Sequence, residues 1–371
     1  GFTRLDALNR IGNAVFAKGL ERPENYAPIN APVNYPHLWT TPWFNWVQYD
    51  GSIMQPLIRN SGEALGLEAA INLTKGEKAT RKGHSNAQYS SSVPVPNLHD
   101  IEKWVAGKHP LKDELKDNYP SYEKKDLPTF TGLQSPKWPF VNKNEVLDIA
   151  KVSHGKRLYK KHCQKCHLPS FDDPEFWTDT YWEKISYTKD DNHMTTKEKY
   201  LKMEIIPLGE INTDPAQATI LEQRTVDIVG LGIETEICVK ATPATGTLDC
   251  NNGDDCNKKW GDTEKSMDWK LTYVPFKDSA TASFALALGA VVDQTNKRWF
   301  EQNYTTKHWQ DVYEGGRPNC LQAAQGYKAR PLNGVWATAP FLHNGSIATI
   351  YDLLSTQTQR PTFVELGSLE F

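Results

Sequence analysis

Several features that would assign a protein to a broad class at once are missing from this sequence. The 371 residues carry a formal net charge of −3, so no excess of basic residues points to a nucleic-acid partner. No apolar run approaches the length of a membrane-spanning helix, and residues 1–10 predict the start of an amphipathic helix rather than a signal peptide. With 39% hydrophobic and 23% charged residues, the composition is typical of a globular protein with two or three packed subdomains.

The most informative motif that is present is C-x-x-C-H, formed by Cys163, Cys166 and His167. Two thiols at this spacing can each add to one vinyl group of a porphyrin, and the adjoining imidazole can bind the iron from one side. A zinc half-site or a redox dithiol would use the same cysteines, but no second pair at zinc-ribbon spacing follows. We therefore expect covalent haem c with His167 as an axial ligand. The motif would follow a helix over residues 144–159 that Asn144 caps.

Four further cysteines, Cys238, Cys250, Cys256 and Cys320, lie outside this motif. Covalent haem attachment takes place outside the cytoplasm, so we expect a periplasmic or secreted protein in which these four form two disulfides. A turn-rich polar loop separates Cys250 from Cys256 and favours a local bridge between them, whereas Cys320 could instead be a buried free thiol. Four cysteines allow three connectivities, so the pairing is open at this stage.

Hydrophobic periodicity predicts helices and few strands. Residues 55–70 and 280–292 have the apolar pattern of helices, and the second segment is expected to lie in the core. Prolines interrupt the aromatic-rich residues 35–46, whose large rings must cover a wall or line a pocket. Residues 165–276 are rich in Asp, Thr, Asn and Trp and show few clean periods. We therefore expect a mainly α protein with long ordered loops and little strand.

One stretch of the sequence resembles a known family. Residues 327–354, which contain T-A-P-F-L-H-N-G-S, resemble the signature of the bacterial di-haem cytochrome c peroxidase and MauG superfamily. Residues 49–57 are similar to a second segment of that superfamily, beside its first haem. Residues 31–66 and 212–216 look most like the branch that contains the rubber oxygenases. Together these segments span nearly the whole chain.

The resemblance implies cytochrome c-like haem domains and an exported, haem-dependent oxidoreductase. Its oxidant would be peroxide or dioxygen, acting on a hydrophobic organic substrate or with a redox partner protein. The superfamily carries two C-x-x-C-H motifs, whereas this sequence has one. We expect residues 1–140 to be the remainder of the first haem domain and residues 141–371 to be the second. The second haem would be attached upstream. The alternative is a mono-haem electron-transfer cytochrome without catalytic turnover.

The resemblance also implies roles for individual side chains. The rubber-oxygenase branch has two axial histidines on this haem, which assigns His343 as the partner of His167. Its alternatives are a His that bonds a propionate or a loop carbonyl, or a Met ligand such as Met194 or Met203. An axially saturated haem could transfer electrons but could not bind oxygen or peroxide.

Gln55 and Glu63 stand roughly where peroxidase relatives place their distal Gln and acid. Glu63 could move a proton off bound peroxide, although an exposed helical Glu is the plainer interpretation. Arg330 and Arg59 could pair with haem propionates or form ordinary surface salt bridges. Superfamily members often hold calcium, and the Asp/Asn-rich residues 251–255 could bind it. This loop lacks full EF-hand spacing, which favours a solvated loop.

Overall fold

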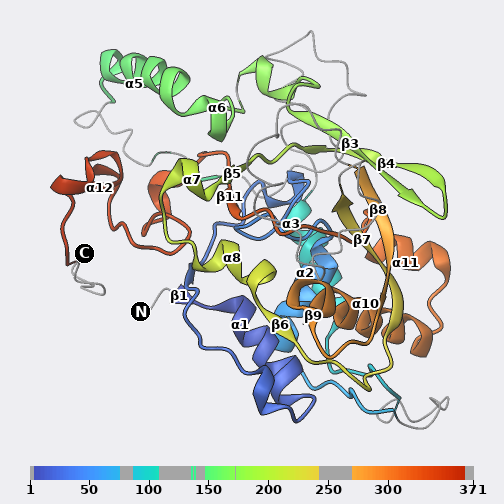
Figure 1. Cartoon of the computed structure of the whole chain (residues 1–371). Coiled ribbons are helices and arrows are strands. Elements are labelled where there is room, and N and C mark those ends of the chain that lie inside the picture. Colours follow the sequence, from blue (N-terminus) through green and yellow to red (C-terminus); the bar gives the residue numbers. More distant parts are fainter. Residues whose placement is uncertain are drawn as a thin grey trace.

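The computed structural model describes residues 4–75, 87–107, 135–136, 138, 147–171, 173–241 and 270–363 (Figure 1). Its helices are α1 (Ala7–Gly12), α2 (Pro56–Gly66), α3 (Val95–Ala106), α5 (Ile149–His162), α6 (Gln164–His167), α7 (Leu208–Ile211), α8 (Ala216–Gln223), α10 (Phe284–Gln302), α11 (Lys307–Tyr313) and α12 (Ile350–Leu354). Its strands are β1 (Arg4–Leu5), β2 (Val33–Asn34), β3 (Trp182–Lys189), β4 (Asn192–Leu201), β5 (Ile205–Pro207), β6 (Thr225–Val226), β7 (Glu234–Ala241), β8 (Lys270–Lys277), β9 (Ala282–Ser283), β10 (Cys320–Leu321) and β11 (Gly326–Lys328). None of the described helices is long and apolar enough to cross a membrane.

The prediction of a mainly helical fold with little strand is wrong. Helices account for 40% and strands for 20% of the structure, and a five-stranded mixed sheet has the order β10-β7-β8-β3-β4. Four of its strands lie within or just beside residues 165–276, which the sequence presented as irregular. The physical reason is exposure: the first four residues of β4 are all exposed, so this strand lacks the apolar alternation that marks a half-buried strand.

A disulfide joins two strands of this sheet. Cys238 in β7 and Cys320 in β10 are parallel partners in the ladder, and both side chains are fully buried. The possibility that Cys320 is a free thiol is therefore excluded. The predicted local bridge between Cys250 and Cys256 lies outside the described residues.

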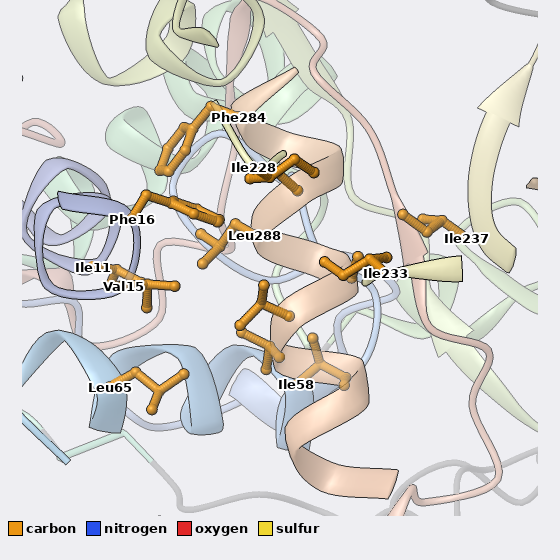
Figure 2. Close-up of a cluster of buried hydrophobic side chains, with 14 of the residues drawn as sticks. Ile11, Val15, Phe16, Ile58, Leu65, Ile228, Ile233, Ile237, Phe284 and Leu288 are labelled. Carbon is orange, nitrogen blue, oxygen red and sulfur yellow. The ribbon is translucent and has the colours of Figure 1, made fainter. Parts of the chain in front are cut away.

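The main hydrophobic core surrounds α10 (Figure 2). Leu288 of this helix packs in one cluster with Ile11 of α1 and Leu65 of α2, and the ring of Phe284 meets that of Phe16 edge to face at 6.1 Å. The helices predicted over residues 55–70 and 280–292 are confirmed as α2 and α10, the second of them buried. Segments from both ends of the chain share this core, and the predicted boundary near residue 140 falls outside the described residues.

Part of the predicted aromatic wall forms a second core. The buried ring of Trp43 packs edge to face against Trp177 and Trp182, with centroid separations of 5.4 and 5.7 Å. Phe44, also fully buried, belongs to the same cluster. The rings of the N-terminal segment thus cover the chain that directly follows the C-x-x-C-H motif.

Helix α5, by contrast, has no buried residue and lies at the outer edge of the molecule (Figure 1). It begins one residue after Asp148, whose carboxylate accepts hydrogen bonds from the backbone N–H groups of Ala150 and Lys151. The predicted cap Asn144 lies outside the described residues. No described atom comes within 4 Å of a Cβ built on Gly155, so one side of the helix is open.

Candidate functional site

Cys163 and Cys166 lie at the junction of α5 and α6. Cys163 ends α5 and directly precedes α6, and its carbonyl accepts hydrogen bonds from the N–H groups of Cys166 (3.2 Å) and His167 (2.9 Å). Residues three positions apart on a helical turn share one face, so both thiols point to one side. Both are free and partly exposed. This arrangement fits covalent attachment to two vinyl groups.

The imidazole of His167 is held by a backbone carbonyl from a distant part of the chain. Nδ1 of His167 lies 2.8 Å from the carbonyl oxygen of Arg330. A carbonyl can only accept, so Nδ1 must carry the proton and Nε2 must carry the free lone pair. Nε2 is therefore available to bind iron, and the hydrogen bond raises its basicity as is usual around metal-binding histidines.

A tyrosine fixes the backbone at the same place. The hydroxyl of Tyr159 donates to the carbonyls of His167 (3.1 Å) and Leu168 (2.7 Å). Burial raises the pKa of Tyr159 to about 12, which keeps the phenol protonated and able to donate. Leu168 takes a positive φ of 66°, and this turn ends α6. The sequence predicted no hydrogen-bonding role for Tyr159, which precedes the motif on α5.

The side chain of Arg330, the residue whose carbonyl contacts His167, is largely buried. Its Nη2 donates to the carbonyl of His37 at 2.8 Å, its guanidinium lies 5.2 Å from the centre of the Phe44 ring, and Nε has no partner. Burial lowers the pKa of Arg330 to about 10. The ion pair between Arg330 and a haem propionate stays a prediction. The contact that the structure does show is the carbonyl on His167.

A second buried cation and a buried acid lie near Arg330. Nζ of Lys328 donates to the carbonyl of Trp46 at 3.1 Å, and burial, followed by the charge of Arg330, lowers the pKa of Lys328 well below its usual value. Burial raises the pKa of Asp50 to about 6. Two basic side chains and one acidic side chain therefore lie close together next to the backbone that accepts the hydrogen bond from His167.

His343 is buried in the turn that the sequence highlighted. Its ring stacks on Tyr327 at 3.8 Å and meets Tyr49 edge to face at 6.3 Å. Nε2 of His343 is buried without a hydrogen-bond partner, and burial lowers the pKa of this imidazole to about 4. A neutral imidazole with an unused nitrogen suits a metal ligand. The contacts of His343 do not include His167, so its assignment as sixth ligand stays a prediction.

His37 is a half-buried residue that the sequence did not predict to be part of the site. Its Nε2 is also buried without a partner, its ring stacks on Trp39 at 4.4 Å, and its carbonyl receives the Arg330 guanidinium. Burial, and then the charges of Arg330 and Lys328, lower the pKa of His37 to about 3. Nothing in the local sequence predicts the contacts with Arg330 and Lys328, because both residues lie far away along the chain.

The two alternative methionine ligands differ in environment. Met203 is buried in the second core, beside the aromatic rings, whereas Met194 is exposed on β4. Among the described residues, no group of three or more His, Cys, Asp or Glu side chains could hold a separate metal ion. Residues 251–255, the predicted calcium loop, lie outside the described part of the chain.

Gln55, the N-cap of α2, and Glu63 within this helix contact different partners. Gln55 is buried at the start of the helix, and its Nε2 donates to the carbonyl of Arg317 at 3.1 Å. Glu63 accepts a hydrogen bond from Gln48 at 2.9 Å and pairs with Arg59 at 3.3 Å. Arg59 therefore forms a salt bridge with a protein carboxylate, which was the alternative to its pairing with a haem propionate.

A cavity of about 40 Å³ is lined in part by Gln48 and Arg59, the two partners of Glu63. It can hold a water molecule but is too small for an organic substrate. The catalytic roles of Gln55 and Glu63 stay predictions.

Residues 326–365 match the family model described as RoxA-like, cytochrome c-like. This RoxA-like region contains β11, Arg330, His343 and α12, and it fits the rubber-oxygenase-like branch to which the sequence was compared. A cytochrome c-like domain of this kind implies covalently bound haem c. The wider di-haem peroxidase and MauG superfamily stays an expectation of the sequence.

Two curated proteins of Sinorhizobium fredii (strain NBRC 101917 / NGR234) are similar to this chain. "Uncharacterized protein y4iJ" is 38% identical over 374 residues, which cover all of this chain and 50% of y4iJ. "Uncharacterized protein y4iM" is 49% identical over 49 residues, which cover 13% of this chain and 11% of y4iM. The chain therefore spans about half the length of y4iJ. No solved structure is significantly similar to it.

Proposed function

We propose that this chain carries one haem c, attached through Cys163 and Cys166 and bound axially by His167, and that the haem exchanges electrons in an exported oxidoreductase. The observation that carries the proposal is the hydrogen bond from Nδ1 of His167 to the carbonyl of Arg330. It sets the tautomer and orients the ring beside two free thiols. When bound, the haem would supply one-electron redox chemistry, and His167 and the two thiols would hold and orient it.

Haem stoichiometry and peptide mass test the attachment. The wild-type chain, produced together with a cytochrome c maturation system, should yield one haem in the pyridine haemochrome assay. The peptide containing residues 163–167 should then carry the mass of a haem. The Cys163→Ala/Cys166→Ala variant should lose both signals, whereas a matched Cys250→Ala/Cys256→Ala variant should keep them. A colourless wild-type protein that binds zinc instead would refute the assignment.

We further propose His343 as the second axial ligand. Its support is the buried Nε2 that has no partner and the low pKa that keeps the ring neutral. Two axial imidazoles would leave no open position on this iron, which suits electron transfer rather than binding of oxygen or peroxide. The disulfide between Cys238 and Cys320 supports a periplasmic or secreted location, since such bridges persist in oxidising compartments.

Catalytic turnover would then belong to a second haem. Support comes from the RoxA-like region and from y4iJ, half of which lies outside the match. We assign Gln55 and Glu63 to the distal side of that haem, with Glu63 as the group that moves a proton. For the protein isolated from its natural source, a haem count near two would agree with this proposal, and a count of one would favour a mono-haem electron carrier.

The RoxA-like match favours oxidative cleavage of a hydrophobic substrate by dioxygen over reduction of hydrogen peroxide. Oxygen uptake with a polyene measures the first reaction, and peroxide turnover with a reduced cytochrome donor measures the second. The Glu63→Gln variant should slow the active reaction with haem content unchanged, since only the carboxylate can take up a proton. Peroxide turnover without oxygen uptake would refute the oxygenase assignment.

A further inference from the structure

The helix that leads into the C-x-x-C-H motif concentrates positive charge. Between Asp148 and His167 the chain has six Lys and Arg residues and a single acid, although the whole chain has a net charge of −3. The rest of the chain is therefore net negative. The basic residues are Lys151, Lys156, Arg157, Lys160, Lys161 and Lys165.

Four of these cations lie on one face of α5. At 100° per residue, Lys156, Arg157, Lys160 and Lys161 fall within one half of the helix, away from the apolar stripe that contains Val152 and Tyr159. All four are exposed. No described acidic residue forms an ion pair with them, whereas Lys151 pairs with the capping Asp148 at 3.9 Å. We call these four residues the cationic face.

Helix stability explains only part of this face. Cations in the last turn interact favourably with the helix dipole, which accounts for Lys160 and Lys161. Lys156 and Arg157 lie further from that end, and each has another cation four residues later. Like charges at this spacing repel each other and destabilise a helix. The clustering of these four cations therefore lowers the stability of the helix. Because the cluster lies next to Cys163 and Cys166, its position favours a role in electron transfer at this site.

We propose that the cationic face of α5 is the docking surface for an acidic redox protein that exchanges single electrons with the haem. This inference rests on the proposed haem attachment. Helix α5 runs directly into Cys163, so Lys160 is only about 5 Å along the helix axis from the attachment point. In the exchange one electron leaves the reduced carrier and reduces the ferric haem, and no bond forms or breaks. A carrier with an acidic patch would be steered to this face by charge complementarity.

Electron-transfer kinetics with charged probes test the proposal. We would follow haem reduction by stopped flow with anionic ferrous EDTA, cationic hexaammineruthenium(II) and a reduced acidic flavodoxin. The rates with ferrous EDTA and flavodoxin should fall as ionic strength rises, and the rate with the ruthenium complex should increase. These signs are opposite to those expected from the overall charge of −3.

Charge-reversal variants locate the effect. Lys156→Glu/Lys160→Glu should slow reduction by flavodoxin and ferrous EDTA at least tenfold at low salt and accelerate reduction by the ruthenium complex. The matched control is Lys184→Glu/Lys277→Glu, which makes the same charge change at exposed positions in β3 and β8 and should alter the rates less than twofold. Circular dichroism and the Lys156→Gln/Lys160→Gln variant, which should be intermediate, check that α5 still forms.

Equal effects of the two charge-reversal pairs would overturn the docking surface, because the overall charge alone would then control the rates. Rates that do not change with salt would also overturn it. Both results require full haem loading in the pyridine haemochrome assay. A wild-type protein that contains no haem would instead overturn the proposed function, and the docking surface with it.

Discussion

The disulfide between Cys238 and Cys320 allows a quantitative prediction. The bridge closes a loop with a sequence separation of 82, and both cysteines are fully buried at parallel positions of β7 and β10. Without this cross-link the unfolded chain has a higher conformational entropy, and the difference corresponds to about 4.5 kcal/mol at 25 °C. We expect the Cys238→Ala/Cys320→Ala variant to lose about 4–5 kcal/mol of unfolding free energy, a third or more of the total for an ordinary domain.

Guanidinium unfolding followed by circular dichroism would measure this loss, with haem content held equal. Wild-type protein treated with a reductant should approach the stability of the variant, whereas the variant itself should not respond to the reductant. A Cys250→Ala/Cys256→Ala variant shows how much of the reductant effect comes from other cysteines. A loss below about 1 kcal/mol would contradict the loop-closure reasoning. Alkylation of Cys238 or Cys320 in the native protein would contradict the pairing itself.

The remaining predictions concern the haem site. Tyr159→Phe removes the hydroxyl that binds the two carbonyls at 2.7 and 3.1 Å, so the unfolding free energy should fall by about 1 kcal/mol. An unchanged stability would show that these bonds contribute nothing. His343→Ala should convert the haem to a high-spin or water-ligated spectrum, and a persistent low-spin spectrum would reject the ligand assignment. His37 should make the protein sensitive to acid: its folded pKa of about 3 lies below its unfolded value of 6.5, so the unfolded state binds the extra proton and stability falls as the pH drops from 6.5 towards 3. In urea titrations at pH 7, 5 and 4, His37→Gln should therefore lose less stability than the wild type, and parallel losses would refute the assignment.

The sequence predicted the parts of the fold that depend on near neighbours. The spacing of Cys163, Cys166 and His167 and the periodicity of α2 and α10 are local signals, and the structure contains these elements. The sheet was missed because its strands carry polar, exposed residues and because its order depends on distant segments. The short strand β10, for instance, gains its place by pairing with β7.

The contacts of the candidate site were also hard to predict from the sequence. The sequence predicted a role for the side chain of Arg330, which lies in the residues 327–354 that carry the resemblance. The group that holds His167 is the backbone carbonyl of Arg330, and every residue type has one. A sequence motif, which specifies residue types, therefore cannot predict a contact made by a backbone carbonyl. His37 was missed for a related reason, because its partners Arg330 and Lys328 come from the far end of the chain.

The separation of 163 residues between His167 and its acceptor Arg330 has a consequence for how the protein is made. Synthesis proceeds from the N-terminus at about 5–20 residues per second, so the C-x-x-C-H segment emerges many seconds before Arg330 exists. During that interval the carbonyl of Arg330 cannot yet accept the hydrogen bond from His167. The contact that orients the imidazole therefore forms only after the RoxA-like region has been made.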